Sequence, residues 1–112
     1  MADTEFPKLI TDLPQADIPM PGVRGWLSQA RDHQIVFMDI DPIGEVPPHS
    51  HGEQWGIVVE GRMKLTIAGR TRVCGPGDSY YIPAGVEHSA RFLSHFRVID
   101  MFADAKRYKP KA

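Results

Sequence analysis

The chain has 112 residues, which is enough for one domain with a hydrophobic core and too few for two. Hydrophobic residues make up 42% and charged residues 24%, a composition typical of a folded globular protein rather than a disordered one. Thirteen Lys and Arg against fourteen Asp and Glu leave a formal net charge of −1. Nucleic-acid binding needs a dense basic surface to neutralise phosphates, so we expect no nucleic-acid partner.

The single cysteine, Cys74, excludes an intrachain disulfide and a multi-cysteine zinc site, and it fits a reducing compartment. The first 20 residues have no basic start followed by an apolar segment, so they do not resemble a signal peptide. No apolar run approaches the roughly 20 residues that a membrane-spanning helix needs. We therefore expect a cytoplasmic protein with no membrane association.

Short apolar segments separated by glycine and proline turns follow one another along the chain. Residues 1–24 are polar and proline-rich, and we expect an N-terminal arm there, followed by a barrel over 25–105 and a basic tail over 106–112. Segment 23–31 fits either a strand or a short helix. Strands are predicted over residues 33–40, 55–60, 62–67, 70–74, 79–82, 87–92 and 96–102. About seven short strands with frequent turns indicate an all-β antiparallel sandwich or barrel.

Two histidines two positions apart stand between residues 44 and 55. Side chains at i and i+2 of a strand point the same way, so His49 and His51 present two imidazoles side by side. Imidazoles with one or two oxygen donors suit Zn, Mn, Fe or Ni. This pair alone does not distinguish a metal site from two ordinary strand histidines.

A second motif, over residues 77–88, makes the pattern specific. Together the two segments resemble the cupin superfamily, in particular its small single-domain members, whose first motif is Gly-(x)5-His-x-His-(x)3–4-Glu-(x)6-Gly and second is Gly-(x)5-Pro-x-Gly-(x)2-His-(x)3-Asn. In the first motif Gly44 is one residue too near the histidines, and in the second Phe92 replaces the final Asn. The matching positions are His49, His51, Gly61, Gly77, Pro83, Gly85 and His88.

The resemblance implies a double-stranded β-helix, a jelly-roll barrel that holds one divalent metal ion (Zn, Mn, Fe or Ni) inside. It implies four metal ligands. Gln54 takes the position of the family's Glu, and strand alternation favours it over Glu53, because Gln54 would share the inner face with Gly56 and Val58. The connecting loop is one residue shorter than usual, which leaves Glu53 as the alternative ligand. The implied ligands are His49, His51, Gln54 and His88.

The last strand places Asp100 and Phe102 on one face. This arrangement is similar to the small cupins that open unsaturated uronate rings, in which an Asp, a Phe and a following basic residue line the pocket. The resemblance implies a catalytic Asp100, with Phe102 and Lys106 or Arg107 binding substrate. Alternatively, Asp100 bonds a tail amide at the rim of the barrel, and Lys106 and Arg107 begin a solvated tail.

Three imidazoles and an amide carry no negative charge, so a bound ion would keep its full +2 charge and act as a strong Lewis acid. We therefore expect isomerisation or ring opening of a small sugar-acid-like substrate, by metal polarisation and proton transfer. A metal-dependent dioxygenase and a non-catalytic carbohydrate-binding module are the alternatives. The outward apolar positions Trp55, Ile57 and Val59 predict a homodimer.

Overall fold

A computed structural model describes residues 5–111 of the chain. Residues 1–4 of the expected arm and residue 112 of the expected tail lie outside the described residues. One short helix and nine strands follow in order: α1 (Lys8–Thr11), β1 (Val23–Gln29), β2 (Gln34–Ile40), β3 (Glu45–His49), β4 (Gln54–Glu60), β5 (Met63–Ile67), β6 (Arg70–Cys74), β7 (Ser79–Ile82), β8 (His88–Phe92) and β9 (Phe96–Phe102).

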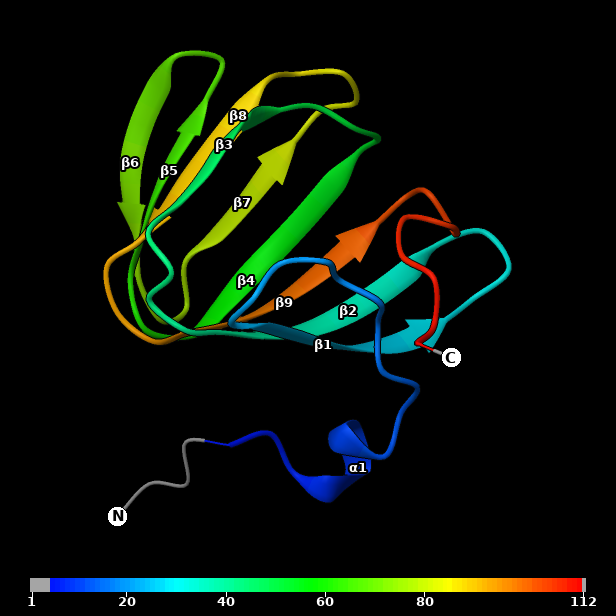
Figure 1. The fold of residues 1–112 in the computed structure, drawn as a ribbon. Coiled ribbons are helices and arrows are strands. Elements are labelled where there is room, and N and C mark those ends of the chain that lie inside the picture. The colour runs from blue at the N-terminus through cyan, green and yellow to red at the C-terminus, as the bar shows by residue number, and fades with distance from the viewer. Residues whose placement is uncertain (1–4, 112) are drawn as a thin grey trace.

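The strands form two antiparallel sheets that face each other (Figure 1). One sheet has the order β1-β2-β9-β4-β7, and the other has the order β3-β8-β5-β6. Sequence neighbours are thus distributed over both sheets, as in a jelly-roll barrel, and the predicted all-β double-stranded β-helix is confirmed. Segment 23–31, for which the sequence allowed either a strand or a short helix, contains strand β1.

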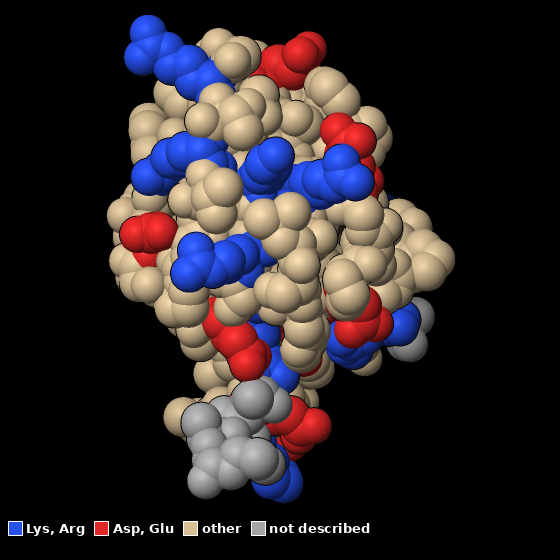
Figure 2. All heavy atoms as spheres, turned by 90° about the vertical axis from the view of Figure 1, so that its left-hand side faces the viewer, with Lys and Arg blue, Asp and Glu red and all other residues tan. Residues whose placement is uncertain are grey.

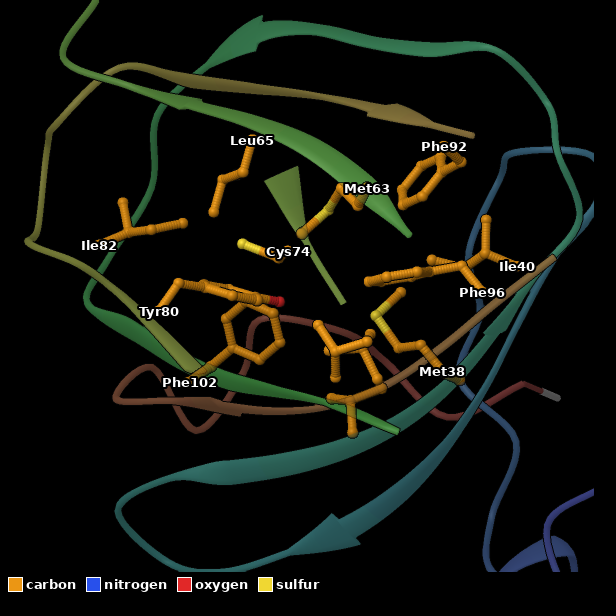
Figure 3. Close-up of a cluster of buried hydrophobic side chains, with 14 of the residues drawn as sticks. Met38, Ile40, Met63, Leu65, Cys74, Tyr80, Ile82, Phe92, Phe96 and Phe102 are labelled. Atoms are coloured by element: carbon orange, nitrogen blue, oxygen red, sulfur yellow. The ribbon is translucent and has the colours of Figure 1, made fainter. Parts of the chain in front are cut away.

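The interior is built by alternation of inward and outward side chains along the central strands. In β9 the side chains of Phe96, Val98, Asp100 and Phe102 are buried, whereas Met101 is 41% exposed. The register between β2 and β9 stacks these side chains on their buried partners from the neighbouring strand. Figure 3 shows apolar side chains from both sheets directed toward one another across the barrel. Asp100 is therefore a carboxyl group placed inside an otherwise apolar layer.

The two outer faces differ in character. Lys and Arg side chains gather on the side of the molecule where β5 and β6 lie (Figure 2). The outer face of the five-stranded sheet carries apolar side chains as well as ion pairs, and the N-terminal arm covers part of it, since the Phe6 ring lies 6.2 Å from that of Trp26 and 5.9 Å from that of Phe37. The uncovered part includes Trp55, Val59, Tyr81 and Met101. Within residues 5–111, no helix has the length and hydrophobicity to span a membrane.

Candidate metal centre and active site

Three histidines meet at one end of the barrel. His49 ends β3 and His88 begins β8, and the two residues are direct partners across the strand pair. Pro47 and Pro48 have no amide hydrogen, so β3 tolerates them only as an edge strand, and the ladder to β8 is irregular there. His51 follows in the loop before β4, with its backbone carbonyl fixed by the amide of Gly85. One nitrogen from each ring lies within 4.8 Å of the others.

Backbone hydrogen bonds set the tautomer of all three rings. The Nδ1 atom of His49 lies 3.0 Å from the Pro47 carbonyl oxygen, that of His51 2.7 Å from Gly52, and that of His88 3.0 Å from Val86. A carbonyl oxygen only accepts, so each Nδ1 carries the hydrogen and each Nε2 keeps a bare lone pair. Orientation by an outer hydrogen bond is the usual arrangement of metal-binding histidines.

The bare nitrogens are arranged as a cation would require. The Nε2 atoms of His51 and His88 lie 3.1 Å apart, and two lone pairs that face each other at this distance repel unless a cation lies between them. With metal–nitrogen bonds of 2.0–2.1 Å, two ligands of one ion lie about 3.0–3.4 Å apart. Burial lowers the pKa of both His51 and His88, which favours the neutral form that coordinates metals. The residues present therefore fit a divalent metal ion.

Gln54 and Glu53 point to opposite sides of the barrel wall. Gln54 is 8% exposed and its amide nitrogen donates a hydrogen bond of 3.0 Å to Oδ1 of Asp100. Because the nitrogen is used in this way, the amide oxygen remains the atom with free lone pairs. Glu53 is exposed, and its carboxylate accepts a hydrogen bond from the Tyr81 hydroxyl on the outer face.

Asp100 is the centre of a buried hydrogen-bond network. Its side chain is 3% exposed, and its Oδ1 atom accepts both the Gln54 amide and the Tyr80 hydroxyl, the latter at 2.5 Å. Within the described part of the chain, no hydrogen bond reaches Oδ2. Burial raises the pKa of Asp100 to about 6. The hydrogen bonds from Tyr80 and Gln54 act in the opposite direction and lower it, but burial has the larger effect. Burial, and then the charge of Asp100, raise the pKa of Tyr80 well above its ordinary value, so Tyr80 remains a donor.

Gly56 makes this network possible. A Cβ atom at this position would lie 2.2 Å from Oδ1 of Asp100 and 2.5 Å from the ring carbon that bears the Tyr80 hydroxyl. Gly56 pairs with Asp100 on one side and with Tyr80 on the other, so the missing side chain leaves the space in which the two groups meet. No motif in the sequence pointed to Tyr80 as a functional residue. The signal that could have found it is its position two residues before Ile82, which places both side chains on the inward face of the strand.

A cavity of about 350 Å³ connects these groups. We call the part formed by His49, His51, His88, Gln54, Tyr80, Asp100 and Arg107 the polar end, and the part formed by Met38, Met63, Phe92, Phe96 and Val98 the apolar end. Phe102 also lines the cavity.

Of the two basic candidates for substrate binding, the structure brings only one to the cavity. Arg107 lines it, with its guanidinium 5.6 Å from the Phe102 ring centre and 4.4 Å from that of Tyr108. Its charge contributes, after burial, to the lowered pKa of His51 and His88. No ion pair joins Arg107 to another of residues 5–111, so its charge is available to an anion. Lys106 is exposed and is not part of the cavity wall.

A second group of potential ligands lies outside the barrel. Asp39, Asp41 and His95 approach one another on the surface near the N-terminal arm. Arg24 lies 2.9 Å from a carboxylate oxygen of Asp41 and 3.2 Å from one of Asp39, and it lowers the pKa of Asp41. Since guanidinium groups already neutralise these carboxylates, the cluster is an ion-pair network.

Comparison with known proteins assigns the chain to a family. Residues 36–102 match the cupin domain family, so the chain belongs to the cupins. It is 35% identical over 107 residues to the H2HPP isomerase of Bacillus subtilis, a match that includes 88% of this chain and 44% of that protein. The chain thus spans less than half of the length of that relative.

Two solved structures show the same fold. An RmlC-like cupin from Shewanella frigidimarina superimposes with a TM-score of 0.75 at 25% identity, covering 86% of this chain and 88% of the other. KdgF from Halomonas sp. superimposes with a TM-score of 0.69 at 26% identity, covering 87% and 86%. The comparisons show the cupin fold. The particular substrate is a matter of the pocket's own residues.

Proposed function

We propose that this cupin is a metal-dependent isomerase that moves a proton on a small carboxylate-bearing substrate. The observation that carries the proposal is Asp100: a buried carboxyl group in the cavity wall, with one oxygen held by Tyr80 and Gln54 and the other without a hydrogen-bond donor among residues 5–111. Three imidazoles share the same cavity. The similarity to an isomerase agrees with this class of reaction.

The proposed roles follow from the chemistry of each group. His49, His51 and His88, with the oxygen of Gln54 as a fourth ligand, would hold one divalent ion, of Zn, Mn, Fe or Ni. Such an ion supplies Lewis-acid polarisation of a substrate oxygen.

The protein's own groups bind the substrate and move the proton. Arg107 pairs with the substrate carboxylate, and the flat guanidinium is kept in place by Phe102 and Tyr108. Asp100 gives or takes the proton through Oδ2, while Tyr80 and Gln54 fix the carboxyl plane by holding Oδ1. The apolar end of the cavity excludes water from this exchange. The uronates opened by the cupins that this sequence resembles are one carboxylate class to test.

The test uses the metal-loaded protein and two pairs of variants. We expect His88→Ala to lose the metal, as measured by elemental analysis, while the circular dichroism of the barrel is retained. Asp100→Asn should keep the metal but reduce the turnover of an unsaturated uronate by about 10²-fold or more. Asp32→Asn, at a carboxylate whose side chain is 86% exposed, is the matched control and should leave turnover unchanged.

Different results would remove different parts of the proposal. An unchanged metal content in His88→Ala would contradict the ligand assignment. Full activity in Asp100→Asn would contradict the proton transfer. Oxygen consumption during turnover would favour a dioxygenase on the same ligands.

We also propose that the protein is a homodimer formed through the outer face of the five-stranded sheet. Trp55, Val59, Tyr81 and Met101 are 41–50% exposed there, next to the part that the arm covers. A contact between two identical apolar faces would exclude water from all of them. Sedimentation velocity should give a dimer for the wild type and a monomer for Val59→Lys. A wild-type monomer at micromolar concentration would contradict this proposal.

A further inference from the structure

The strand register separates the polar and apolar ends of the cavity along the barrel axis. On β8, His88 pairs with Ile67, while Phe92, four residues further along, pairs with Met63. On β9, Asp100 is likewise four residues from Phe96. Four residues of a strand span about 13 Å. A ligand that touches the histidines with one end and lies along the barrel axis therefore points its other end toward the apolar end.

The apolar end offers no partner to a hydroxyl group. Its side chains are two thioethers, two phenyl rings and a valine, all from strands whose backbone groups are paired within the sheets. Figure 3 shows Met38, Met63, Phe92 and Phe96 directed toward the same part of the barrel interior. The hydrogen-bonding groups Gln54, Tyr80 and Asp100 belong to the polar end, and they already bond one another.

The size of the cavity fits a ring with a short side chain. An apolar cavity of about 150 Å³ is enough to hold benzene. The cavity of about 350 Å³ leaves room for a ring of that size and for a head group at the histidines and Arg107. A polyhydroxylated ring of similar size would fit by volume, but its hydroxyls would lose their water without gaining protein partners.

We propose that the substrate is an amphipathic organic acid. Its carboxylate head lies at the polar end, and its body, toward the apolar end, is a cyclic or branched hydrocarbon that carries few or no hydroxyl groups. The inference rests on the proposed function, because the acidic head is assigned from Arg107 and the histidines. It changes the substrate class expected from the sequence, since a sugar acid carries a hydroxyl on most of its carbons.

Three small ligands of matched ring size test the proposal by calorimetry on the metal-loaded protein. Cyclohexanecarboxylate has an apolar six-membered ring and one carboxylate, glucuronate has a hydroxylated six-membered ring and one carboxylate, and cyclohexylmethanol has the apolar ring without the charge. We expect cyclohexanecarboxylate to bind about 100-fold more tightly than glucuronate, since an added hydroxyl in an apolar pocket costs about that factor. Glucuronate binding equally well or better would overturn the inference and leave the proposed function intact.

The uncharged ligand separates the two proposals. If cyclohexylmethanol binds as tightly as the acid, the apolar body is supported and the anion-binding role of Arg107 in the proposed function is contradicted. If none of the three binds in the millimolar range, both proposals are overturned.

A methionine-to-glutamine pair locates the body of the ligand. Met38→Gln keeps the length of the side chain and places an amide at the apolar end, so we expect affinity for cyclohexanecarboxylate to fall about tenfold with unchanged metal content. Met101→Gln makes the same change on the outer face and should have no effect on affinity. Met63→Gln repeats the test from the facing sheet should Met38→Gln fail to fold. Unchanged affinity in a folded apolar-end variant would overturn the inference.

Discussion

The polar and apolar ends of the same cavity are built by different means. At the polar end the groups are held one by one: each imidazole by a backbone carbonyl, and Asp100 by Tyr80 and Gln54. At the apolar end no directional bond acts, and the side chains are held by packing alone. The two ends nevertheless occupy the same strands, since β8 and β9 contribute to both.

Because the two ends are held differently, we expect variants at the polar end to affect function and variants at the apolar end to affect stability. Removing a group at the polar end leaves the sheet ladders and the packed layers in place, so its main effect is expected on binding and turnover. Removing a group at the apolar end leaves a void in the part of the interior that supports the fold. Variants at the two ends should therefore fall into two classes.

Phe96→Ala should have the largest effect on stability. Phe96 is fully buried at 0% exposure and contacts the Phe92 ring at a centroid distance of 5.3 Å. Truncation of a buried phenylalanine costs about 3–5 kcal/mol. Chemical denaturation should show this loss, while any folded fraction still binds metal. A loss of metal without a loss of stability would contradict the division between the two ends.

Asp100→Asn should increase stability at neutral pH, whereas Phe96→Ala decreases it. The pKa of Asp100 in the folded protein is about 6, above the 3.8 of an ordinary Asp, so between these values the folded state binds more protons than the unfolded state. The contribution of Asp100 to the stability of the wild type is therefore complete at low pH and is lost as the pH rises through about 6. The asparagine keeps the acceptor for Tyr80 and Gln54 and does not titrate.

Measured on metal-free protein, the variant should gain about 2 kcal/mol relative to wild type between pH 4 and pH 7.5. Asp32→Asn is the matched control, because a hydrogen bond with His33 lowers the pKa of Asp32 and no such gain is expected. A pH-independent difference between Asp100→Asn and wild type would show that burial of the charge is not the cause.

The sequence predicted the polar end better than the apolar end for a physical reason. The histidines and Gln54 stand at fixed spacings within two short motifs, and strand alternation is enough to direct Gln54 inward and Glu53 outward. The apolar end has no motif, because any residue of suitable volume can fill a packed layer. Its shape depends on the register between β2, β9, β5 and β8, which joins residues far apart in the chain.

The Asp100 network lies between these two cases. Its alternation was visible in the sequence, but its partner Tyr80 comes from another strand, and the pairing of β4 with both β7 and β9 brings the two together. The same register explains Gly56, which in the sequence is an ordinary strand glycine. Likewise, the sequence did not distinguish Lys106 from Arg107, since only the folded tail shows which of the two lines the cavity.

Gly56→Ala tests the boundary between the two ends. The added methyl group would overlap Oδ1 of Asp100 and the Tyr80 ring, both of which are buried and have little room to move. We expect a loss of about 1–3 kcal/mol, as for other overpacked sites, together with reduced turnover. In a Tyr80→Ala background, which lacks the phenol, Gly56→Ala should cost less stability than it does in the wild type, because part of the overlap is gone. An equal loss in both backgrounds would mean that the glycine is required by the backbone.

Glu53→Gln should have the smallest effect, and it separates the two residues that compete for the fourth ligand position. Glu53 is exposed and bonds Tyr81 on the outer face, so removal of its charge should change neither metal content nor stability by more than about 0.5 kcal/mol. Gln54→Leu, one residue further on and facing inward, should weaken metal binding and also deprive Asp100 of one donor. Elemental analysis of the two variants gives the comparison directly. Reduced metal content in Glu53→Gln with normal content in Gln54→Leu would reverse the assignment and place the carboxylate among the ligands.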